Sequence, residues 1–97
     1  MSQLVQYEIT IVLNEEFNDT ELKNWAFEYA QELQKLNSAE ISVISRGKRE
    51  LAYSINNSGK GNFIQINFTS VPKYIDIFSK NLKSDTNVLR YLVLNKN

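Results

Sequence analysis

The chain has 97 residues, 42% of them hydrophobic, and it contains neither cysteine nor histidine. These absences remove disulfides, thiolate and imidazole metal ligands and the usual general base, so we expect no enzyme activity, no cofactor and no metal site. Eleven basic and eleven acidic residues give a net charge of zero, so overall charge does not favour nucleic acid or a membrane. The length predicts one domain over residues 1–97.

The charges are unevenly spread along the chain. Residues 1–40 hold two lysines against eight acidic residues, whereas residues 41–97 hold nine basic residues against three acidic ones. Such asymmetry favours one face for a polyanion and another for solvent or a basic partner. An equally good interpretation is that the segment charges average out once the chain folds.

No segment predicts a membrane span or a targeting peptide. No apolar stretch approaches the roughly 20 residues that cross a bilayer. The first five residues lead directly into an alternating strand pattern, without the basic start and apolar run of a signal peptide. We expect a protein that is made where it works or that has lost a leader.

The first 40 residues predict a strand followed by a helix. Alternating apolar residues indicate a strand over 4–13. Asn18 is a typical helix N-cap, with Glu21 as its capping-box partner, and Asn37-Ser38 ends the helix. One apolar stripe follows helical spacing, made of Leu22, Trp25, Ala26, Tyr29, Leu33 and Leu36. Trp25 and Leu33 are therefore expected in the core.

The middle of the chain predicts two strands. The first runs over 40–53 and is interrupted at Gly47, where we expect a bulge. A Gly- and Asn-rich turn is expected over 56–61, and the next strand over 62–69.

The last third predicts a second helix and a final strand. Pro72 suits a first helical turn, and Val71, Ile75, Phe78 and Leu82 form its stripe. The strand covers 88–94, with Leu89, Tyr91 and Val93 inward.

The resulting order, β-α-β-β-α-β, predicts an α+β fold of the ferredoxin-like split βαβ type, in which a four-stranded antiparallel sheet carries both helices on one face. The other face is open, and we expect it to present Glu8, Thr10, Val12, Phe63, Gln65, Asn67, Arg90 and Leu92.

Most polar motifs have a structural explanation. Gly59-Lys60-Gly61 lacks the spacing of a phosphate-binding loop and precedes a strand, so a hairpin turn is favoured. The acidic residues at 15, 16, 19 and 21 lie near a helix start, where capping is favoured over acid–base catalysis.

One basic segment is a candidate phosphate contact. Arg46, Lys48 and Arg49 lie within four residues beside the expected bulge, where they fit either phosphates or a solvated strand edge. The third strand does not continue the base-stacking pattern of RNA-recognition motifs after Lys60-Gly61. Phe63 is its single open-face aromatic, which disfavours that mode of binding.

Three patches resemble the bacterial-type ribosomal protein S6 family. They are residues 7–9 (Tyr-Glu-Ile), residues 47–53 (Gly-Lys-Arg-Glu-Leu-Ala-Tyr) with Ile55, and Asp85 with residues 88–93. The resemblance extends over about residues 6–94. The family usually has a basic residue where this chain has Gln6 and a proline where it has Ser54, and the tail here is short.

The resemblance implies a structural ribosomal protein that binds small-subunit rRNA as a pair with protein S18, without membrane or small-molecule substrate. We expect five cations to face rRNA or this partner: Arg46, Lys48, Arg49, Lys60 and Arg90. Richness in Asn, Ile and Lys indicates an AT-rich genome. A plastid ribosome is the preferred location, with the bacterial cytoplasm as the alternative.

Two other functions fit the same fold class. One is a ferredoxin-like regulatory domain that binds a ligand or dimerises through its sheet. The other is a small hydrolase of the acylphosphatase type, which is disfavoured because residues 14–17 are acidic where that enzyme cradles phosphate.

Overall fold

Six elements follow one another in the predicted order over residues 4–55 and 58–96, the part of the chain that the computed structural model describes. They are β1 (Val5–Asn14), α1 (Asp19–Lys35), β2 (Ala39–Ile55), β3 (Ser58–Ser70), α2 (Lys73–Ser84) and β4 (Val88–Asn95). No helix among the described residues is long and apolar enough to cross a membrane.

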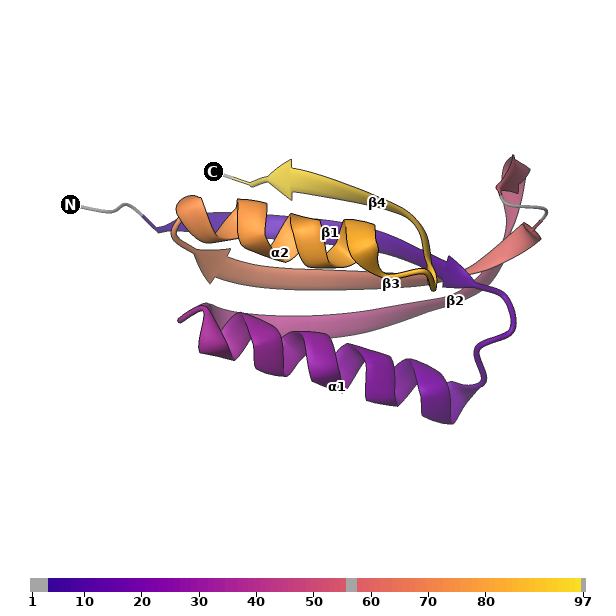
Figure 1. The fold of residues 1–97 in the computed structure, drawn as a ribbon, viewed down its shortest axis with the longest axis horizontal. Coiled ribbons are helices and arrows are strands. Elements are labelled where there is room, and N and C mark those ends of the chain that lie inside the picture. The colour runs from indigo at the N-terminus through magenta and orange to yellow at the C-terminus, as the bar shows by residue number, and fades with distance from the viewer. Residues whose placement is uncertain (1–3, 56–57, 97) are drawn as a thin grey trace.

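The strands form one antiparallel sheet in the order β2-β3-β1-β4. Both helices cover the same face, with α2 over β1 and β3 and α1 along β2 (Figure 1). The predicted ferredoxin-like fold is therefore confirmed. In the described part of the chain no helix covers the other face (Figure 1), and β2 and β4 are the edge strands.

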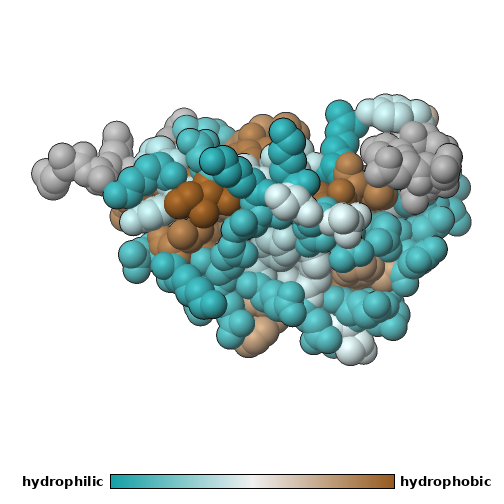
Figure 2. Space-filling model, in the orientation of Figure 1, coloured by the Kyte–Doolittle hydropathy of each residue, from teal (hydrophilic) through white to brown (hydrophobic). Residues whose placement is uncertain are grey.

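Burial alternates along the central strands because successive side chains point to opposite faces. The core lies between sheet and helices and consists of Ile9, Ile11, Leu13, Trp25, Tyr29, Leu33, Ile64, Ile66, Phe68, Phe78 and Leu82, joined at its margin by Val5 and Tyr7. Trp25 and Leu33 keep only 6% and 1% of their surface exposed, which confirms their predicted core positions. On the helical side the surface is mostly hydrophilic, with small scattered apolar patches (Figure 2).

The ends of α1 follow from local side-chain chemistry. The Asn18 side chain accepts a hydrogen bond from the Glu21 amide at 2.8 Å, and the Glu21 carboxylate accepts one from the Asn18 amide at 3.0 Å. This confirms the capping box predicted from the spacing of the two residues. At the other end Asn37 has a φ of 61°, a left-handed conformation that asparagine tolerates and that stops the helix.

Asp85 ties the turn before β4 to α1. Its Oδ2 accepts hydrogen bonds from Trp25 Nε1 and from the Tyr29 hydroxyl, both at 2.9 Å. Its Oδ1 accepts a third from the Asn87 amide at 2.9 Å. The entry of β4 into the sheet is thus fixed by a carboxylate that bonds the first helix.

The predicted turn over 56–61 is wrong for residues 58–61, which begin β3; residues 56 and 57 lie outside the described residues. Gly61 pairs with Arg49, and Lys60 pairs with Glu50. Glycine is common in turns, but Gly61 lies in a strand at a position where a side chain would not fit. A Cβ there would lie 2.4 Å from Val12 Cγ1.

The inward assignment of Leu89 is also wrong. The β1–β4 register shifts between Val12 and Leu13, so Arg90 pairs with Val12 while Val88 pairs with Leu13. This irregularity leaves Leu89 between the two pairs. Val88 packs against the core in its place, together with Tyr91 and Val93 as predicted.

Candidate nucleic-acid interface

The bulge expected at Gly47 is confirmed, and it decides which side chains of β2 reach the open face. Ser45 pairs with Ile64, a core residue, whereas Gly47 pairs with Phe63 on the opposite face. One extra residue, Arg46, lies between these pairs. Gly47 has a φ of +88°, which a glycine adopts without strain. The odd-numbered side chains over 41–45 therefore face the helices, whereas those that follow the bulge face the open side of the sheet.

Beyond this bulge the β2–β3 hairpin extends past the helical layer (Figure 1). We call residues 47–55 and 58–61 the arm. It curls over the open face, so a side chain of β2 contacts one of β4 although two strands separate them in the sheet. Arg90 Nη1 donates a hydrogen bond to the Tyr53 hydroxyl, and the guanidinium carbon lies 5.9 Å from the centre of the ring.

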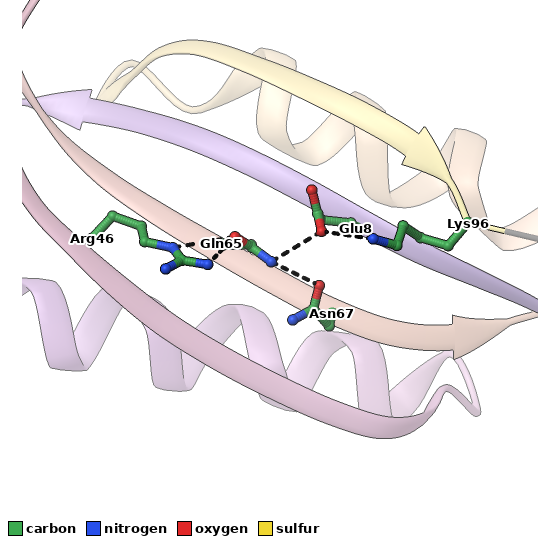
Figure 3. Close-up of polar contacts among 5 residues, drawn as sticks. All are labelled: Glu8, Arg46, Gln65, Asn67 and Lys96. Carbon is green, nitrogen blue, oxygen red and sulfur yellow. Dashed lines mark hydrogen bonds and ion pairs between the residues drawn. The ribbon is translucent and has the colours of Figure 1, made fainter.

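Arg46 lies at the base of the arm in a row of polar side chains across the open face (Figure 3). Its Nε and Nη2 donate to Gln65 Oε1 at 3.2 and 2.7 Å. Gln65 Nε2 in turn donates to Glu8 Oε1 at 3.0 Å and to Asn67 Oδ1 at 3.1 Å. A guanidinium has five N–H donors, and these contacts use two of them. Arg46 is held in place with donors to spare.

Arg49 completes a set of three guanidinium groups on this face. Its guanidinium carbon lies 5.7 Å from the centre of the Phe63 ring, which stands on the open face between β2 and β1. We call Arg46, Arg49 and Arg90 the arginine trio. All three are exposed. Across residues 4–55 and 58–96 none of them forms a salt bridge with a carboxylate.

The other two predicted site residues lie apart from the trio. Lys48 pairs with Asn62, and Lys60 pairs with Glu50, so the register places both lysines on the reverse face of the arm. Both are exposed. The structure thus gathers three of the five predicted cations on the open face and leaves the other two behind them on the same arm.

The far end of the open face has a different chemistry. A shallow hollow of about 390 Å³ there is lined by Glu8 and Glu40 together with Lys96 and neutral polar side chains. Lys96 Nζ lies 3.4 Å from Glu8 Oε1, which offsets one of the two carboxylates. This end therefore has one more negative than positive charge, whereas the arm has an excess of positive charge. Within the described part of the chain, no group of acidic side chains is arranged to hold a metal ion.

Sequence analysis missed two features of this surface. All eight open-face residues lie on that face, but Val12 is only 6% exposed because the arm covers it. Tyr53 is absent from the predicted set, yet it lies over β4 with 60% of its surface exposed. Part of the signal is present in the sequence, because a bulge at Gly47 shifts the residues that follow it in β2 by one face. The curvature that brings Tyr53 over β4 is not.

Close relatives of this chain are plastid ribosomal proteins. It is 69% identical over 96 residues to the small ribosomal subunit protein bS6c of Trieres chinensis, covering 99% of this chain and 100% of that protein. It is 62% identical to the bS6c protein of Phaeodactylum tricornutum, covering 99% and 98%. The cyanobacterial bS6 protein of Trichodesmium erythraeum is 30% identical over 91% of this chain and 75% of its own length. These relatives support the plastid ribosome as the location, with the bacterial cytoplasm as the alternative.

A solved structure has the same fold. The crystal structure of 30S ribosomal protein S6 from Thermotoga maritima superposes with a TM-score of 0.88, covering 97% of this chain and 89% of that one, at 16% sequence identity. The family described as "Ribosomal protein S6" matches residues 6–95, nearly the whole chain. These relatives are ribosomal proteins, which sets aside the hydrolase and the regulatory domain. The chain is not an enzyme, and it belongs to the ribosomal protein S6 family of the small subunit.

Proposed function

We propose that this protein binds small-subunit rRNA together with ribosomal protein S18, as a structural constituent of the subunit. The observation that carries the proposal is the arginine trio, three exposed guanidinium groups at one end of the open face that have no carboxylate partner among the described residues. A guanidinium matches phosphate oxygens with two parallel donors, so this arrangement suits a phosphate backbone.

Lys48 and Lys60 extend the same positive surface around the arm. Over residues 46–61 the chain carries four basic residues and one acidic residue, Glu50. Contacts of this kind hold a protein in register on RNA without reading its sequence. The arm is therefore proposed to position the protein on rRNA.

A neutral protein needs help to bind RNA. Affinity for a polyanion grows with the number of phosphates neutralised, and five cations give only a modest number. A basic partner that carries further phosphate contacts supplies the rest, and S18 is proposed in this role. Residues 15–35, which lead into and form α1, carry six acidic and two basic residues and offer such a partner a complementary surface.

The test is a salt series of rRNA binding by the protein together with S18. The variant Arg46→Ala/Arg49→Ala/Arg90→Ala should bind a small-subunit rRNA fragment more weakly than the parent. The slope of log affinity against log salt concentration should fall by about one for each phosphate that the variant no longer neutralises. Filter binding between low and high salt measures both quantities.

A matched control separates position from net charge. Lys23→Ala/Lys80→Ala/Lys83→Ala removes the same charge from exposed residues of the two helices. It should leave the slope almost unchanged. Equal weakening in the two triple variants would mean that net charge alone governs binding, and an unchanged slope in the arginine variant would move the RNA surface away from the arm.

A further inference from the structure

A small apolar cavity lies under the arm, on the open face. Its volume is about 190 Å³, and its walls include Val12, Leu51 and Phe63, with the exposed residues Glu50, Ala52, Tyr53 and Arg90 at its rim. The register places Val12 directly opposite Phe63 on one side and Arg90 on the other. The cavity therefore lies above β1 in the middle of the sheet and is roofed by the curled arm.

Two residues at the rim of this cavity, Tyr53 and Arg90, carry groups that stack on flat rings. Tyr53 is 60% exposed, so much of its ring is free for contact. Arg49 lies over Phe63 and Arg90 over Tyr53, each with its guanidinium carbon within 6 Å of a ring centre. Unpaired bases are bound in proteins by stacking on aromatic side chains and on guanidinium planes.

The size of the cavity limits what enters it. A cavity of about 150 Å³ accommodates a benzene ring. Drug-sized ligands occupy about 300–1,000 Å³. At about 190 Å³ this cavity holds one small flat ring. Among the described residues, Glu50 is the one acidic residue that lines the cavity, and the three guanidinium groups of the arginine trio outnumber it. This excess of positive charge favours a ring attached to a negatively charged group.

We propose that the cavity receives one unpaired nucleobase of an RNA strand whose phosphates are held by the arginine trio. The inference rests on the proposed function and adds to it a base contact, where the function itself needs only phosphate contacts. The base stacks against Tyr53, with Val12 and Leu51 forming the apolar floor. The contact is by shape and stacking, so it distinguishes an unpaired base from a paired one rather than one sequence from another.

Nuclear magnetic resonance of the full chain tests the cavity with defined probes. Guanosine 5′-monophosphate should shift the methyl signals of Val12 and Leu51 in a saturable way. Ribose 5-phosphate, which has the same phosphate but no base, should leave them in place. Tyr53→Ala should weaken nucleotide binding about tenfold, the usual effect of removing one stacking aromatic. Tyr74→Ala, which removes the ring of a different cation–aromatic pair on α2, should have no effect.

A trinucleotide with guanosine in the centre tells an RNA strand from a free nucleotide. It should bind more tightly than the mononucleotide, because its further phosphates meet the same positive surface. Tighter binding of the mononucleotide would assign the cavity to free nucleotides and overturn the inference. So would equal shifts from ribose 5-phosphate, or none from either probe.

The two proposals fail in different ways. If the arginine variant loses salt dependence while the cavity signals never respond to a base, the arm binds phosphate only, and the base contact is wrong while the function stands. If the cavity takes the base but the arginine variant binds rRNA like the parent, the rRNA proposal fails at the arm instead.

Discussion

At the scale of the residue, Asp85 is a partly buried carboxylate whose surroundings change its pKa. Burial by itself disfavours its charged form, but hydrogen bonds from Asn87, Trp25 and Tyr29 outweigh this and hold the pKa of Asp85 below its usual range. Burial also raises the pKa of Tyr29, and the adjacent Asp85 carboxylate raises it further. At neutral pH Tyr29 is therefore a neutral phenol that donates a hydrogen bond to the charged carboxylate of Asp85.

This arrangement predicts a loss of stability in acid. A carboxylate whose pKa is lowered by folding stabilises the protein above its unfolded pKa, near 3.9, and loses that contribution as pH falls through the lowered value. Asp85→Asn should therefore cost roughly 1–3 kcal/mol at pH 7 and progressively less below about pH 4. Denaturant unfolding followed by Trp25 fluorescence between pH 7 and pH 3 measures the difference. A cost that is the same at both ends would show that the charge is not what matters.

At the scale of the element, the arm depends on the close approach of β3 to β1. A Cβ on Gly61 would meet Val12 Cγ1 at 2.4 Å and the Leu13 carbonyl oxygen at 3.2 Å, whereas a Cβ on Gly59 would meet nothing within 4 Å. Val12 is short, branched and buried, so it has little room to move. The two glycines of one strand thus have different reasons for being there.

Gly61→Ala should destabilise the protein by about 1–3 kcal/mol, the usual cost of overpacking. Gly59→Ala introduces the same methyl group into open space and should change stability by less than about 0.5 kcal/mol. Thermal or denaturant unfolding of the two variants gives the comparison directly. Matching losses would indicate that β3 resists any side chain at its start, not that Val12 occupies the space.

The elements also show what sequence patterns could and could not predict. The ends of α1 were predictable because capping is local, carried by Asn18 and Glu21. The start of β3 was not, because pairing of Gly61 with Arg49 depends on a partner strand rather than on the glycine itself. Leu89 was misplaced for the same reason, since the irregularity opposite Val12 and Leu13 belongs to the strand pair.

The candidate site also has features that the sequence predicts and features that it does not. The five cations were identified from their residue types, but their division between two faces follows from the bulge and the register. Tyr53 joins the site because the arm curls over the sheet, and no local pattern encodes that curvature. Charge is readable from a sequence, while the face on which it appears needs the fold.

At the scale of the whole molecule, one core holds both helices to the sheet. Leu33 of α1 is 1% exposed within it, and Phe27 of the same helix is 64% exposed. Leu33→Ala should therefore lower the free energy of unfolding by about 2–5 kcal/mol. Phe27→Ala should change it by about 0.5 kcal/mol or less. Equilibrium denaturation checks both, and a large loss from Phe27→Ala would reveal that its side of α1 is packed in solution.

The acidic first part of the chain and the basic residues of the arm lie on different sides of the molecule. The acidic residues of segment 15–35, which leads into and forms α1, lie on the helical side. The arginine trio lies on the open face. The negative charge is concentrated along α1, because α2 on the same side carries three lysines against one aspartate. A molecule of zero net charge thus presents a negative helix and a positive arm, a distribution that suits a protein placed between a basic partner and a polyanion.

The bulge at Gly47 has a consequence for how such a surface evolves. Deleting this single codon would restore a regular ladder with Arg46 opposite Phe63, and the residues that follow would keep their partners and their faces. If the chain kept Gly47 but lost the bulge, the rest of β2 would rotate by one face, and Lys48 and Glu50 would take the places that Arg49 and Leu51 hold over the sheet. The bulge thus lets β2 gain or lose one residue at this position while the chemistry of the surface beyond it is preserved.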